Sequence, residues 1–235
     1  MFIWLLKRLI TILISPYITL RSIFFNKPSF KYSEPFKSVD FSIMMDRIDD
    51  QYSTRFVLPK SVLEDLIHEL KSEKYHRIFK DFNIKNPFVN YVVLYETRTL
   101  SELDANKSIY ANHWHTDDSL DVGSLKIFQL PKTISPSEGP MEFINKENTK
   151  LNWKKFFFRG RFLSYKSQIF NYTQSNKALF LDARSCMHKA GVPENDNKRT
   201  MLMLQIIDRK KNENIDELYN KQYHKEPTAL KRLFI

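Results

Sequence analysis

From Pro87 onward, short apolar runs alternate with polar turn residues along the chain. The runs are rich in Val, Ile, Leu, Phe and Tyr, which pack well on a pleated sheet, and the turns contain Gly, Pro, Asp and Asn. The predicted strands are Phe88–Glu96, Leu125–Leu130, Ala178–Leu181 and Met201–Ile207. A helical front segment followed by many short strands predicts a mainly β fold with flanking helices, arranged as an antiparallel barrel or jelly roll.

The front segment contains a clear helical pattern. Apolar residues recur at a spacing of three and four positions from Leu63 to Leu70, which predicts a helix with one apolar stripe. Ser61 and Glu64 have the spacing of a capping box at its start. A further helix is expected near Ile215–Tyr223.

The first 25 residues, Met1–Phe25, are strongly apolar but are interrupted by Lys7 and Arg8. On a helix, the polar residues share one face and the apolar residues cover the rest, which predicts an amphipathic helix lying in a membrane interface. An uninterrupted apolar run of about 20 residues, as a membrane span needs, is missing. Packing of this helix on its own domain or in a dimer is the alternative.

These patterns divide the chain into four parts. Residues 1–25 form the amphipathic helix, and residues 26–38, with Pro28 and Pro35 among polar residues, are predicted to be a linker. The main β domain is expected at residues 39–210, and residues 211–235 form a basic C-terminal tail.

Composition excludes several kinds of site. A chain of 235 residues with 42% hydrophobic residues can bury a substantial core. It has only 4 glycines, so a Gly-rich phosphate loop is missing. Cys186 is its single cysteine, which rules out an intrachain disulfide and a cysteine-based zinc site. A metal site in this chain must therefore use His, Asp and Glu.

The chain is basic, with a net charge of +10 from 37 Lys and Arg against 27 Asp and Glu. That balance suits an anionic substrate or an anionic membrane surface, as well as a simple solvated surface. No run of Arg and Lys is interleaved with aromatic residues, so no nucleic-acid partner is expected. We expect a small-molecule or lipid-linked substrate, a cytoplasmic location, and peripheral membrane contact through the N-terminal helix.

The candidate chemistry starts at His115 and Asp117. Residues two apart on a strand point to the same side, so these two side chains are expected to project together into a barrel interior. His188, which follows the strand Ala178–Leu181, is the natural third ligand. Two His and one carboxylate on one face leave three positions open on a six-coordinate ion, the facial triad of non-haem Fe(II) oxygenases.

Arg199 is the second element of the candidate site. It lies 11 positions after His188 (199 − 188), and a hairpin through Gly191–Asn197 is predicted to bring it back beside the His188 strand. The planar guanidinium of Arg suits a buried carboxylate because it makes two parallel charged hydrogen bonds.

Together these stretches resemble the Fe(II)/2-oxoglutarate-dependent dioxygenase superfamily, and most closely its phytanoyl-CoA dioxygenase-like branch. The resemblance covers about Tyr91–Ile207. It is carried by His115-Thr116-Asp117, by the strand Leu125–Leu130 with the turn Glu138-Gly139-Pro140-Met141, and by His188 and Arg199 at family-like spacing. It implies a double-stranded β-helix (jelly-roll, cupin-like) core.

The resemblance also implies a reaction. His115, Asp117 and His188 would be the catalytic iron ligands, and Arg199 would bind the distal carboxylate of 2-oxoglutarate. With Fe(II), 2-oxoglutarate and O₂, such enzymes hydroxylate a substrate and release succinate and CO₂. Two positions depart from the family pattern: Ala190 replaces a hydroxyl residue, and Met141–Ile144 replaces a Pro-Gly-Ser-His sequence.

Two other interpretations remain open at the level of sequence. A cupin-type metalloenzyme that does not use 2-oxoglutarate would bind its metal with His113, His115 and His188, and with Asp118 or Glu142. A catalytically inactive jelly-roll protein would serve only in binding. Metal analysis and turnover of 2-oxoglutarate separate the three.

Overall fold

The computed structural model describes residues 27–42, 45–104, 107, 109, 111–117, 124–149 and 167–223. The strands in these residues are β1 (Phe30–Ser33), β2 (Asp46–Asp49), β3 (Ser53–Val57), β4 (Pro87–Arg98), β5 (Ser124–Gln129), β6 (Met141–Phe143), β7 (Phe170–Tyr172), β8 (Ala178–Leu181), β9 (His188–Lys189) and β10 (Lys198–Asp208). The helices are α2 (Lys60–Leu70), α3 (Glu73–Asp81), α5 (Ile215–Lys221) and the 3₁₀ turn η1 (Pro136–Glu138).

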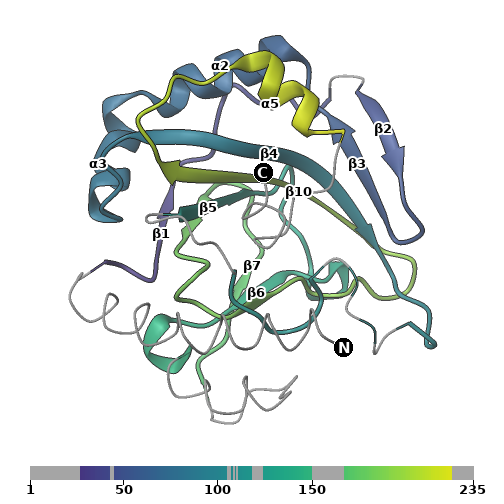
Figure 1. Ribbon diagram of the computed structural model, residues 1–235. Helices are drawn as coiled ribbons and strands as arrows, with labels where there is room; N and C mark the ends of the chain where they lie inside the picture. The colour runs from purple at the N-terminus through teal and green to yellow at the C-terminus, as the bar shows by residue number, and fades with distance from the viewer. Residues whose placement is uncertain are drawn as a thin grey trace, which may run out of the picture.

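The strands form two antiparallel sheets. The larger has the order β1-β8-β5-β10-β4-β3-β2, and the smaller has the order β7-β6-β9. Figure 1 shows α2, α3 and α5 over one face of the large sheet, with β6 and β7 on its other side. The fold class is therefore confirmed: a mainly β jelly-roll core with flanking helices.

Alternation along the long central strands explains why both faces of the large sheet are covered. Val92 of β4 and Leu204 of β10 belong to the core cluster beneath the helices. Tyr95 and Met201, paired across the same two strands, belong to the cluster on the opposite face. All four strands predicted from the sequence are confirmed, as β4, β5, β8 and β10.

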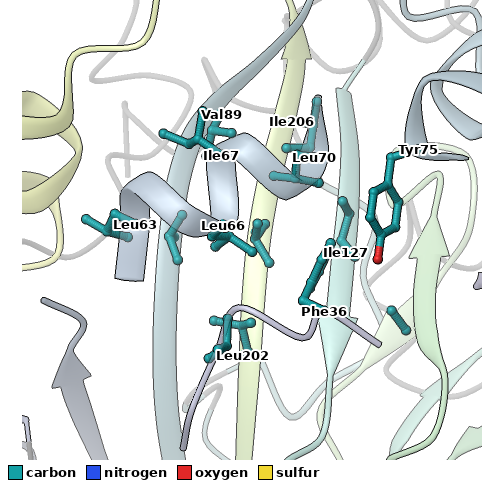
Figure 2. Packing of buried hydrophobic residues seen from close by; sticks show 14 of the residues in the cluster. Phe36, Leu63, Leu66, Ile67, Leu70, Tyr75, Val89, Ile127, Leu202 and Ile206 are labelled. Atoms are coloured by element: carbon teal, nitrogen blue, oxygen red, sulfur yellow. The ribbon is translucent and has the colours of Figure 1, made fainter. Parts of the chain in front are cut away.

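The apolar stripe of α2 packs onto the large sheet, as Figure 2 shows for Leu63, Leu66, Ile67 and Leu70. The predicted capping box at its start is wrong. The helix begins at Lys60 with Pro59 at the N-cap and without a side-chain cap hydrogen bond, so Ser61 already lies inside the first turn. Burial of each of these side chains contributes about 1.5–3 kcal/mol, which exceeds the roughly 1 kcal/mol of a typical N-cap.

Two predicted extensions belong to the domain itself. Residues 26–38, expected to be a linker, include β1, which pairs with β8. The expected tail contains α5, whose Leu218 is buried. Just beyond it, the Gln222 side chain bonds both main-chain groups of Leu58. The predicted helix at residues 1–25 lies outside the described residues, and no helix within them is long and apolar enough to span a membrane.

Candidate metal centre

Two segments that are distant in the sequence bring His115, Asp117 and His188 together. The main chains of His115 and His188 form an isolated antiparallel bridge, with N–O distances of 3.0 and 2.9 Å. β9 in turn pairs with β6, where His188 lies opposite Phe143. The main-chain N–H of Asp117 donates to the carbonyl of Ala183, just past the end of β8, at 3.0 Å. His115 forms only an isolated bridge and Asp117 lies outside the strands, so the expectation that the two residues lie on one strand is wrong.

The three side chains converge on one small volume. One potential ligand atom from each lies within 4.8 Å of the other two. Oδ1 of Asp117 is 3.7 Å from Nε2 of His188 and 4.0 Å from Nε2 of His115. Ligand bonds of about 2.0–2.2 Å place neighbouring donor atoms about 3 Å apart, so small side-chain rotations close this set around one ion.

Main-chain carbonyls fix the orientation of both imidazoles. Nδ1 of His115 lies 2.8 Å from the carbonyl oxygen of His113, and Nδ1 of His188 lies 3.0 Å from that of Cys186. A carbonyl oxygen can only accept, so each Nδ1 carries the proton. In the neutral imidazole, Nε2 then carries the lone pair that metal ligation by histidine requires.

The protonation states also suit a cation. Burial, assisted by the charge of His115, lowers the pKa of His188 to about 3, so this imidazole is neutral near pH 7. Burial raises the pKa of Asp117, but the ammonium of Lys126, with smaller effects of the neighbouring histidines, outweighs burial and lowers it overall. A neutral His188 imidazole therefore faces the ionised carboxylate of Asp117. The His115 side chain is 29% exposed, so solvent reaches the metal centre from the side of His115.

Lys126 is a residue of this site that the sequence interpretation missed. It lies in β5, where every residue is buried, and its Nζ is 2.9 Å from Oδ2 of Asp117. Its neighbours Leu125 and Ile127 point to the helix-covered core, so Lys126 points to the opposite face. A Lys inside an apolar central strand is rarely buried without a charged partner, and that was the signal available in the sequence.

Arg199 is fully buried at the start of β10. Its Nη1 donates to the carbonyls of Gly139 and, at 3.1 Å, of Gly191. The predicted hairpin is wrong, because β9 pairs with β6 while β10 pairs with β4 and β5. The connection crosses from the small sheet to the large one, and the guanidinium still reaches the turn that follows His188.

Two glycines allow the turns beside Arg199 to approach each other. Gly139 has φ = +67°, and a Cβ there would lie 2.5 Å from the nitrogen of Pro193. A Cβ on Gly191 would lie 2.7 Å from the carbonyl carbon of Gly139. Both contacts are closer than real Cβ atoms show, so larger residues would separate the two carbonyls that hold Arg199.

Tyr95 lies in the field of both buried cations. Burial raises the pKa of its phenol, and the charges of Arg199 and Lys126 lower it in part. The phenol therefore stays neutral near pH 7, on the same face of the sheet as the metal centre.

The ligand set of a cupin-type site is not assembled among the described residues. The group that could hold a metal there contains neither His113 nor Glu142. Glu142 instead pairs with Lys189 at 2.9 Å. Asp118 lies outside the described residues.

Comparison with known proteins gives a match at the level of structure. No family model and no curated protein matches the chain. The fold is similar to that of SnoN, a non-heme alpha ketoglutarate-dependent epimerase from nogalamycin biosynthesis, with a TM-score of 0.50 and 12% identity over 82% of this chain and 84% of that one. It is also similar to HygX from Streptomyces hygroscopicus, solved with nickel and 2-oxoglutarate bound, with a TM-score of 0.52 and 13% identity over 80% and 86% of the chains. These likenesses show a shared jelly-roll fold.

Proposed function

We propose that this protein is a non-haem Fe(II), 2-oxoglutarate-dependent oxygenase that hydroxylates a small or lipid- or carrier-linked substrate. In this proposal His115, Asp117 and His188 hold the iron. The observation that carries it is the convergence of two oriented Nε2 atoms and one ionised carboxylate on the scaffold described above. SnoN, an alpha ketoglutarate-dependent epimerase, and HygX, solved with nickel and 2-oxoglutarate bound, support the same class of chemistry on this fold.

The donor set fits Fe(II). Two imidazole nitrogens and one carboxylate oxygen on one side of an ion are the ligands of the facial triad. No fourth His, Cys, Asp or Glu joins the group within the described part of the chain, so the remaining positions are left for external ligands. A structural zinc site would instead fill all four of its positions with protein ligands.

Arg199 supports 2-oxoglutarate as the co-substrate. Its Nη1 is anchored to the carbonyls of Gly139 and Gly191, which gives the guanidinium a fixed orientation near the turn after His188. A guanidinium in a buried site binds a carboxylate through short, charge-assisted hydrogen bonds. We therefore assign Arg199 to the distal carboxylate of 2-oxoglutarate.

The protein side chains and the bound groups have different roles in the proposed reaction. Fe(II) and 2-oxoglutarate, when bound, supply O₂ activation and oxidation of the substrate, with release of succinate and CO₂. The imidazoles of His115 and His188 and the carboxylate of Asp117 hold the ion and keep one of its sides open. Arg199 orients the co-substrate. The buried surroundings of His188 keep bulk water away from the ion on the His188 side of the centre.

The prime substrate is proposed from charge. The chain carries a net charge of +10, which suits an anionic small molecule or lipid-linked substrate. Residues 1–25 are proposed to make peripheral membrane contact as an amphipathic helix. Loss of binding to anionic liposomes after their deletion would support this contact, and unchanged binding would contradict it.

An anaerobic-to-aerobic turnover assay tests the proposed function. The purified protein is loaded with Fe(II), and succinate formation from 2-oxoglutarate is measured after O₂ is added. Fe(II)-dependent succinate that disappears in Asp117→Ala supports the proposal. Metal binding without succinate would favour the cupin-type alternative, and the lack of both would favour a binding protein.

A further inference from the structure

We propose that Lys126 is a positioning residue that holds Oδ2 of Asp117, so that Asp117 offers a single oxygen, Oδ1, to the metal. This inference rests on the proposed function, because it assigns a task at the same centre. It adds a residue whose charge decides how many positions on the ion stay open.

The two oxygens of Asp117 face different partners. Oδ1 points toward the two imidazoles, at 3.7 Å from Nε2 of His188 and 4.0 Å from Nε2 of His115. Oδ2 is 2.9 Å from Nζ of Lys126. An ion pair of this length between two largely buried groups is a strong electrostatic contact, so it favours one rotation of the carboxylate over the others.

Lys126 is itself held firmly. Its strand lies between two others in the large sheet, where Lys126 pairs with Leu181 of β8 on one side and Gln205 of β10 on the other. Its side chain is 11% exposed. Asp117, by contrast, lies outside the named strands and is tied to Ala183 by its main chain. A cation on a central strand therefore fixes a carboxylate on a less regular segment.

The number of oxygens that Asp117 gives to the metal has a chemical consequence. Two His and one single-oxygen carboxylate leave three of six positions open, which are enough for a two-atom chelate and O₂ together. A carboxylate that binds through both oxygens would leave two positions. The co-substrate and O₂ would then compete for them, so the reaction needs Oδ2 kept off the ion.

The same contact weakens metal binding to some degree, because an ammonium group near a divalent cation repels it. The inference therefore predicts a split result when Lys126 loses its charge. Metal affinity stays the same or rises, while binding of a third external ligand beside 2-oxoglutarate weakens. A residue that only supported the fold would lower both together.

The split is measured with Ni(II) as a redox-inert probe of metal affinity, and with nitric oxide, a surrogate for O₂, titrated anaerobically into the form that holds Fe(II) and 2-oxoglutarate. In Lys126→Met, Ni(II) affinity is expected to equal or exceed that of the wild type, and nitric oxide affinity to fall by about tenfold or more, the lower range for groups that orient metal ligands. Lys189→Met is the matched control. It also removes a Lys beside His188, but one paired with Glu142 rather than with a ligand, so neither affinity should change.

Unchanged affinity for nitric oxide in Lys126→Met would overturn the inference, as would parallel loss of Ni(II) binding, nitric oxide binding and thermal stability. A crystal structure of the wild-type Ni(II) form gives a test that does not depend on the variant folding. One oxygen of Asp117 on the ion with Oδ2 on Lys126 supports the inference, and both oxygens on the ion refutes it. Failure of the wild type to bind Ni(II) and 2-oxoglutarate would instead count against the proposed function.

Discussion

Acidification of the metal-free protein is predicted to destabilise it through His188. Burial and the charge of His115 lower the pKa of this residue to about 3, from 6.5 in the unfolded chain. A histidine held neutral in the fold contributes stability that is fully present above its unfolded pKa. That stability is lost as the pH falls from 6.5 toward 3, because the unfolded chain binds a proton that the folded chain does not.

The size of this loss of stability follows from the pH range between the unfolded and folded pKa values of His188. Each pH unit within it removes up to about 1.4 kcal/mol, so a change from pH 7 to pH 5 costs about 2 kcal/mol. For a chain of this size, that corresponds to a decrease in Tm of roughly 4–8 °C. Asp117 adds little between these pH values, because its pKa is lowered from 3.8 and its effect begins only at more acidic pH.

Urea unfolding at pH 7 and pH 5, with a chelator present, measures this loss. The chelator is needed because metal binding carries its own pH dependence. His188→Gln is the control: its stability is lower at both pH values, but the difference between them should shrink by about 2 kcal/mol. An equal pH dependence in the two proteins would refute the reasoning from burial.

Three further predictions concern other parts of the account. Arg199→Met should weaken 2-oxoglutarate binding by about 100-fold while leaving Ni(II) affinity near that of the wild type, because it removes charged hydrogen bonds to the distal carboxylate; calorimetry tests this, and equal 2-oxoglutarate affinity would contradict it. Gly191→Ala should lower the free energy of unfolding by more than about 2 kcal/mol, since its Cβ would lie 2.7 Å from the Gly139 carbonyl carbon; a urea midpoint like that of the wild type would contradict it. Deletion of residues 1–25 should abolish sedimentation with anionic liposomes without changing Ni(II) affinity, and full retention of liposome binding would show that the helix is not the membrane contact.

Much of the fold could be predicted because its central strands have a clear apolar pattern in the sequence. β4, β5, β8 and β10 are apolar runs bounded by turns, and tertiary packing agrees with that local pattern. Pro28 and Pro35 among polar residues predict a linker at residues 26–38, and only pairing with β8 makes the short, half-polar Phe30–Ser33 a strand. The predicted capping box is wrong because Pro59 is the N-cap of α2. Ser61 therefore lies two positions after the N-cap, inside the first turn.

For the site, spacing identified the residues but not their geometry. His115, Asp117, His188 and Arg199 were selected by type and order along the chain, and the structure brings the first three together. Their route differs from expectation, because β9 and β10 belong to different sheets. Lys126 could not be paired with Asp117 from the sequence, because the packing of β5 against a distant segment brings the two together and no local pattern encodes that contact.

The number of Fe(II) ions bound per chain tests the central claim most directly. Equilibrium dialysis under anaerobic conditions, followed by metal analysis, compares the wild type with His115→Ala, Asp117→Ala and His188→Ala. We predict one tightly bound Fe(II) per wild-type chain and a large loss of affinity in each variant. A wild type that binds no Fe(II), or any one variant that binds it as tightly as the wild type, would contradict the assignment of these three residues to one metal ion.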